Sequence, residues 1–207
     1  MNVRLQHAIN FTAGIYYDGH LQMNNYMSKI YMLTNTPDSA ANNIAFERIK
    51  YFVYNQLDSS IFINSEDEEQ CQKYVDAGLN ITTFPGDPVD QLVGIMLYYK
   101  LKAITEERMI IGEVEISSNL GDGLIYIHGE SETIDELTPP NWWNSTDLVH
   151  CDSTLIETDK IVSMHQSSVW RELELAWPDI EDDKPDNEPE TGNTVVFADF
   201  KKLNDTE

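Results

Sequence analysis

The chain has 207 residues, of which 36 are acidic and 13 are basic, so its formal net charge is −23. Nucleic acid and anionic lipid repel such a polyanion, which argues against direct nucleic-acid binding and against binding to a membrane surface. The 41% apolar content is typical of a globular protein, and the length suits one domain or one domain with an appendage.

The first 60 residues predict a hairpin followed by a helix. Apolar residues alternate over residues 3–11, which is the period of a strand. Asp18-Gly19 is a strong hairpin-turn signal, and a second extended run covers residues 26–34. Thr36, Pro37 and Asp38 favour a helix start, with Thr36 as the N-cap, and an apolar stripe at helical spacing continues from there to Leu57.

Four further elements are expected before residue 106. Residues 61–63 and 81–84 resemble short strands, and between them Ser65 and Glu68 form a capping box for a helix that ends at Gly78. A third helix is expected over residues 88–105, with Asp87 as its N-cap. Apolar side chains nearly encircle this helix, so it should be central and buried.

Residues 109–116 and 124–128 predict a second hairpin across a turn that contains Gly121-Asp122-Gly123. Glu113 and Glu115 would share one face of its first strand, so one face of the sheet should meet water. The fold class is therefore predicted to be α+β. Its mixed or antiparallel sheet would combine the N-terminal hairpin and the 109–128 hairpin, with about three helices.

The character of the chain changes after residue 129. Residues 1–129 are expected to form the α+β core domain, and residues 130–177 an irregular, Trp-containing extension with one helix. Residues 178–193 combine seven acids with three prolines, which predicts a disordered acidic linker. Residues 194–207 would then be a strand-like segment and tail.

The sequence offers no motif that specifies catalysis, a metal or a cofactor, so no residue is assigned to those roles. His150-Cys151-Asp152 places reactive side chains in a row, but consecutive residues of an extended segment point to alternate sides. A zinc site from His128, His150 and Cys151 lacks the close-spaced ligand pairs of known sites. We expect Cys71 and Cys151 to be free thiols rather than a disulfide, because the N-terminal residues lack the apolar segment of an export signal.

Two segments are candidates for binding a partner. Trp142-Trp143 follows a proline pair. We weigh two roles for it equally: anchoring an interface with a partner, or packing in the domain's own core. The terminal segment with Val195, Phe197 and Phe200 is apolar and suits strand addition, either to the chain's own sheet or to a partner.

Three segments carry a resemblance to a known group of proteins: residues 86–97 (GDPVDQLVGIML), residues 116–123 and residues 195–201. The chain resembles uncharacterised acidic proteins encoded by T4-like tailed bacteriophages, notably those of marine bacteria. The resemblance covers roughly residues 1–130 and the terminal segment. It implies a viral protein in a bacterial cytoplasm or a virion, and it transfers no catalytic residue.

These observations favour a non-enzymatic, acidic accessory protein that binds the basic surface of a host or phage protein. In the most specific form of this function, its acidic face would mimic nucleic acid. A virion or assembly component is the first alternative. A small enzyme with a site around residues 128–152 is the second. No cofactor is expected, and the expected location is the cytoplasm.

Overall fold

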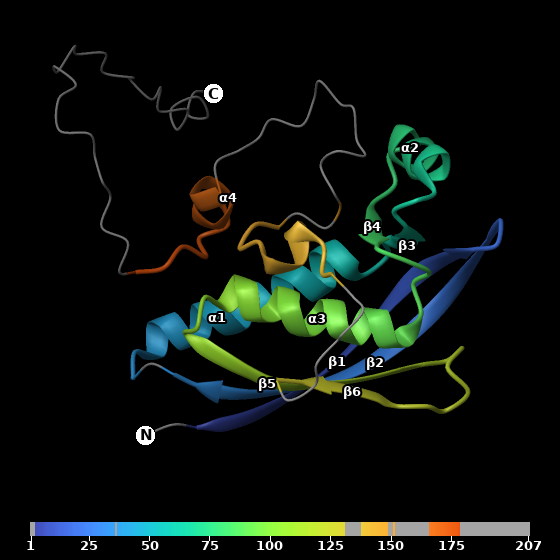
Figure 1. Ribbon diagram of the computed structural model, residues 1–207. Helices are drawn as coiled ribbons and strands as arrows, with labels where there is room; N and C mark the ends of the chain where they lie inside the picture. Colours follow the sequence, from blue (N-terminus) through green and yellow to red (C-terminus); the bar gives the residue numbers. More distant parts are fainter. Residues whose placement is uncertain (1–2, 36, 131–137, 149–150, 152–165, 179–207) are drawn as a thin grey trace, which may run out of the picture.

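The computed structural model describes residues 3–35, 37–130, 138–148, 151 and 166–178. The fold is α+β, as the sequence predicts. A six-stranded mixed sheet has the order β4-β3-β1-β2-β5-β6, and the helices cover one of its faces (Figure 1). None of the helices in these ranges is both long enough and apolar enough to cross a bilayer.

The centre of the sheet is the long hairpin of β1 (Arg4–Tyr17) and β2 (His20–Thr34). The two strands pair without interruption from Arg4 and Leu33 to Tyr17 and His20. The predicted turn is confirmed: Asp18 and Gly19 have φ angles of 48° and 77°, the left-handed region that a two-residue hairpin turn requires.

The segment after β2 adds two parallel strands to the hairpin. It runs through α1 (Ser39–Tyr51), the π-helical η1 (Phe52–Leu57), β3 (Ile61–Asn64), α2 (Glu68–Asp76) and β4 (Ile81–Phe84). Strand β3 is parallel to both β1 and β4. The capping box predicted for α2 is wrong, because Asp67 is the N-cap and makes no side-chain capping bond.

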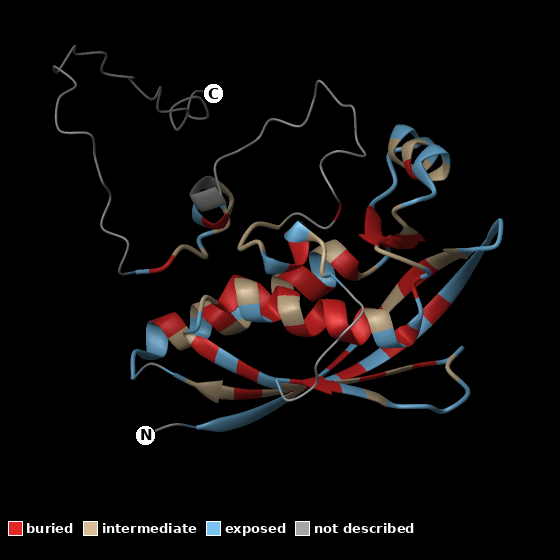
Figure 2. Ribbon diagram, viewed as in Figure 1, coloured by how far each residue is buried: buried red, intermediate tan, exposed pale blue. Residues whose placement is uncertain are grey.

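Helix α3 (Asp90–Thr105) is the central helix that the sequence predicts, and most of its residues are buried. It packs on α1 and β5, and Figure 2 shows its burial along most of its length. It begins two residues later than expected, since Val89 has extended backbone and is the N-cap. Asp87 therefore does not cap the helix and is exposed to solvent.

The second hairpin consists of β5 (Met109–Ser118) and β6 (Tyr126–Gly129). β5 pairs antiparallel with β2, which joins both hairpins in one sheet. Val114 and Ile116 are buried beneath the helices, whereas Glu113 and Glu115 are only partly buried. This confirms the predicted division between a core face and a solvent face.

The described parts of the later chain pack onto this core. They contain η2 (Asn141–Asn144), a 3₁₀-helix, and α4 (Gln166–Glu172). Four tryptophans from these parts lie in the main hydrophobic core: Trp142, Trp143, Trp170 and Trp177.

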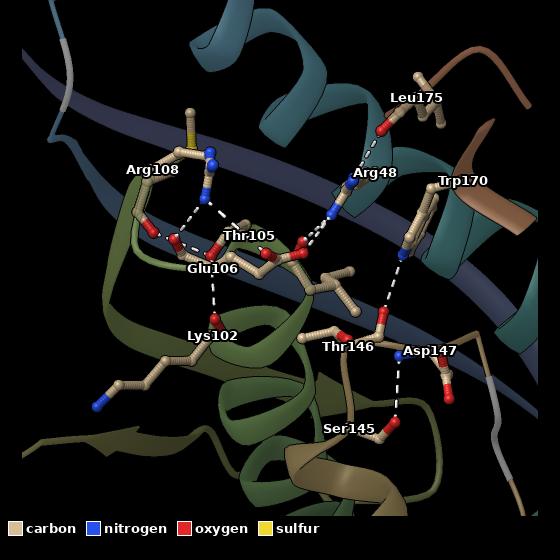
Figure 3. Close-up of polar contacts among 12 residues, drawn as sticks. Arg48, Lys102, Thr105, Glu106, Arg108, Ser145, Thr146, Asp147, Trp170 and Leu175 are labelled. Atoms are coloured by element: carbon tan, nitrogen blue, oxygen red, sulfur yellow. Dashed lines mark hydrogen bonds and ion pairs between the residues drawn. The ribbon is translucent and has the colours of Figure 1, made fainter. Parts of the chain in front are cut away.

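Arg48 of α1 holds the last of these parts in place (Figure 3). Its guanidinium lies 4.5 Å from the ring centre of Trp170 and 3.7 Å from that of Trp177. Its Nε donates to the carbonyl of Leu175 at 2.8 Å, and its Nη1 is 2.8 Å from Oε1 of Glu106. One buried cation thus joins α1, the end of α3 and the segment after α4.

Candidate functional site

A cavity of about 580 Å³ lies at one end of the sheet, between two turns and the start of a helix. The β1–β2 turn, the β5–β6 loop and the start of α3 line the cavity. Figure 1 shows that these three parts of the chain lie at the same end of the sheet. The apolar and aromatic part of the lining consists of Ile15, Tyr17, Pro88, Val89, Leu120, Leu124 and Tyr126. The polar side chains of the lining are Asp18, His20, Gln22, Asp87, Asp90 and Asp122.

Backbone geometry brings these residues together. The β2–β5 pairing ends at Tyr26 and Ser118, so the β1–β2 turn and the β5–β6 loop extend beyond the sheet at the same end. Within the β5–β6 loop, Asp122 and Gly123 both have positive φ, which turns the chain back toward β6. The expectation that Gly121-Asp122-Gly123 forms a hairpin connection is therefore confirmed.

Asp90 is the most deeply buried polar residue of the lining. It is the first residue of α3, and only 8% of its surface is exposed. The hydroxyl of Ser118, at the end of β5, lies 2.9 Å from its Oδ1 and 2.7 Å from its Oδ2. Gly121 backs directly onto the same carboxylate, because a Cβ at this position would collide with Oδ2. The helix start and the β5–β6 loop are thus fixed around one carboxylate.

His20 is the one imidazole in the described lining of the cavity. Its Nδ1 lies 2.7 Å from the backbone carbonyl oxygen of Asp18. A carbonyl can only accept, so Nδ1 carries a proton and donates it. In the neutral ring the lone pair is then on Nε2. This tautomer allows His20 to accept a proton from a molecule in the cavity.

The residues singled out from the sequence lie elsewhere. Trp142 and Trp143 are buried in the core, with 3% and 0% of their surface exposed, and a partner-binding role for them stays a prediction. His128 packs against the rings of Tyr98 and Tyr99, at centroid distances of 5.0 Å and 5.9 Å. Val195, Phe197 and Phe200 lie outside the described residues, as do His150 and Asp152.

The described residues do not assemble the reactive cluster considered around residues 128–152. Cys151 lies in a separate small core with Cys71, and both side chains are buried. Burial raises the pKa of Cys71 to about 11, with a further contribution from Asp67, so this thiol is protonated at neutral pH. Within the described ranges, no three His, Cys, Asp or Glu side chains gather closely enough to hold a metal ion.

Sequence reasoning missed the cavity residues Asp18, His20, Asp90 and Asp122. Both turns that frame the cavity were recognised as turns, and each carries an aspartate. The missing information was the pairing of β2 with β5, which places the two turns at the same end of the sheet. Asp90 was missed because the helix was expected to begin before it.

No protein-family model and no curated protein sequence matches the chain. Solved structures with a similar fold include an uncharacterised protein from Wolinella succinogenes, at 11% identity and a TM-score of 0.45, over 62% of this chain and 98% of its own. The 6-pyruvoyl tetrahydropterin synthase of Plasmodium vivax aligns at 12% identity and a TM-score of 0.39, over 63% and 98%. The Plasmodium falciparum synthase aligns at 14% and 0.34, over 63% and 97%.

The function expected from the sequence, a non-enzymatic, phage-type accessory protein, is not retained. Several of the similar structures are enzymes, and none of those named is described as a phage protein. That expectation depended on net charge and on the lack of a recognisable catalytic motif, and neither property excludes a ligand cavity built from separate turns. The identities and TM-scores transfer no substrate and no residue role to this chain, so its own geometry has to supply them.

Proposed function

We propose that the protein binds a small organic molecule in the cavity between the β1–β2 turn, the β5–β6 loop and the start of α3. The observation that carries the proposal is the cavity itself. Its volume of about 580 Å³ falls in the range of small-molecule sites. Its composition is also typical of such sites, because apolar and aromatic walls surround a few polar groups.

The lining also contains groups that transfer protons. His20 has Nε2 as its acceptor in the neutral ring, and Asp18, Asp87, Asp90 and Asp122 supply carboxylates to the same cavity. Imidazole and carboxylate are the usual general acids and bases of enzymes. If the bound molecule reacts in the cavity, His20 is our candidate for the residue that takes up or releases the proton.

A fragment screen tests the proposal. We expect small aromatic fragments to shift the amide NMR signals of Tyr17, His20, Leu124 and Tyr126, which come from both sides of the cavity. Signals of Met27 serve as the internal control, since Met27 is exposed on a strand of the sheet and does not line the cavity.

A matched pair of substitutions gives the decisive comparison. Leu124 and Leu79 are both exposed, and only Leu124 lines the cavity. Leu124→Trp should fill part of the cavity and weaken fragment binding at least tenfold, whereas Leu79→Trp should leave it unchanged. The proposal fails if fragments bind only outside the cavity, or if both variants bind them as the wild type does.

A further inference from the structure

The Asp90 carboxylate is buried, and none of the described residues places a cation beside it. More than nine-tenths of the residue is buried, and none of the ion pairs formed by the described residues includes it. A buried carboxylate needs compensation by opposite charge or by several hydrogen-bond donors. Among the described residues, the donor to this carboxylate is one hydroxyl, that of Ser118.

That hydroxyl cannot satisfy the carboxylate. Ser118 has one proton to donate, although its oxygen lies within 2.9 Å of both carboxylate oxygens. An ionised carboxylate offers about four acceptor positions. The positive end of α3 supplies part of the compensation, because Asp90 is the first residue of the helix. Asp90 lines the cavity, so a bound molecule can supply the remainder.

The rest of the lining selects the charge of that molecule. Asp18, Asp87 and Asp122 add three more carboxylates, and no lysine or arginine is part of the described lining. Such a field favours cations and disfavours anions. The walls include Tyr17, Tyr126 and Leu124, which offer apolar contact and two aromatic faces to an organic body rather than oxygen ligands to a bare metal ion.

We propose that the ligand of this cavity is a small organic cation, an amine with an apolar or aromatic body, whose nitrogen donates hydrogen bonds to the Asp90 carboxylate. This proposal rests on the proposed function, because it specifies the chemical class of the molecule that the cavity takes.

Three probes of nearly equal size separate charge from shape: benzylamine as the cation, benzyl alcohol as the neutral analogue and benzoate as the anion. Their dissociation constants are measured by NMR titration at 150 mM salt, where nonspecific attraction to the surface is screened beyond about 8 Å. We expect benzylamine to bind in the cavity at least tenfold more tightly than benzyl alcohol, and benzoate to bind more weakly than both.

Asp90→Asn removes the charge and keeps the shape, so it should bring the amine and the alcohol within about threefold of one another. The matched control is Asp67→Asn, which removes a carboxylate at the start of α2, outside the cavity lining. It should preserve the preference for the amine. If Asp90→Asn does not fold, Ser118→Ala replaces it: this variant keeps the charge and removes its donor, and the preference for the amine should persist or grow.

The outcomes distinguish the two proposals. If the amine and the alcohol bind equally well in the cavity of the wild type, the proposal of an organic cation is wrong, and the proposal of a small-molecule site remains valid. A preference for the amine that survives in Asp90→Asn, or is lost in Ser118→Ala, overturns Asp90 as its anchor. If neither the three probes nor any screened fragment binds in the cavity, both proposals fall.

Discussion

At the scale of single residues, the most unusual group is the amine of Lys100, which has no exposed surface. Its Nζ donates to the carbonyls of Trp142 and Ser145, each at 2.9 Å, and to the carbonyl of Asp147. These three bonds attach the segment around η2 to the central helix. Burial lowers the pKa of Lys100 to about 7, and the charge of Asp147 opposes this shift.

The lowered pKa of Lys100 predicts that stability rises with pH. In the unfolded chain the amine titrates near 10.5, so between pH 7 and 10.5 the unfolded state binds more protons than the folded state. The free energy of unfolding should therefore increase through this window, by up to about 1.4 kcal/mol per pH unit, and Lys100 should add no slope below pH 7. Urea unfolding at pH 7.0, 7.75 and 8.5 measures the slope.

Lys100→Met should remove this slope, while Lys102→Met, on the exposed side of the same helix, should keep it. The pH series ends at 8.5 to limit the effect of Cys71 titration on the slope. Because its pKa is raised to about 11, its thiol lowers the stability of the folded state from about pH 9 upward. An equal slope in the wild type and in Lys100→Met would contradict a lowered pKa for the buried amine of Lys100.

At the scale of elements, Arg48 links parts of the chain that are far apart in sequence. Its nitrogens donate to the carbonyls of Leu175 and Ile104, and its guanidinium is stacked against two tryptophan rings. The charge lies inside the structure, with 2% of the residue exposed. Such a contact should determine whether the segment after α4 stays docked.

Arg48→Met is expected to destabilise the fold by about 2–4 kcal/mol, because it removes the donor to the buried Ile104 carbonyl and to the partly buried Leu175 carbonyl, as well as the cation between the rings. Arg48→Lys should rescue little of this loss, since an ammonium lacks the planar fork and stacks poorly. Lys50→Met is the control. Lys50 forms an exposed pair with Glu47 on the same helix, and its loss should cost less than about 1 kcal/mol. If Arg48→Met and Lys50→Met lower the free energy of unfolding by equal amounts, Arg48 does not hold the segment after α4 in place.

Most elements of the fold could be predicted from the sequence, whereas their exact starts and the cavity could not. Hydrophobic periodicity located both hairpins, the short strands β3 and β4 and the buried helix α3, because local patterns encode burial. Helix starts were less accurate: α3 begins at Asp90 because Val89 keeps extended backbone after Pro88. The cavity escaped prediction because it depends on long-range pairing between β2 and β5, which no local pattern specifies. Arg48 and Lys100 did leave a signal, as cations within otherwise apolar helical stripes.

At the scale of the whole molecule, the charge of −23 bears on both stability and binding. Self-repulsion among like charges disfavours the compact state, and dissolved salt screens it. The described residues contain four ion pairs, so the acidic surface is only partly neutralised within these ranges. The same excess charge supports a preference for cations at the cavity.

Salt is therefore expected to stabilise the protein. The free energy of unfolding should rise between 20 and 150 mM NaCl and level off above this concentration, where the Debye length is already about 8 Å or less. Thermal unfolding at pH 7.5 over a NaCl series measures the effect. Stability that is flat below 150 mM, or that rises only at molar salt, would assign the salt effect to general salting-out rather than to repulsion among the acidic residues.

A crystal structure of the full chain soaked with benzylamine would show whether the cavity beside Asp90 holds a small molecule. We expect density for the ligand between the β1–β2 turn and the β5–β6 loop, with its ring near Tyr17 or Tyr126 and its nitrogen about 2.7–3.0 Å from an Asp90 oxygen. A cavity filled by the protein's own side chains, or benzylamine bound only at other acidic sites on the surface, would contradict this expectation.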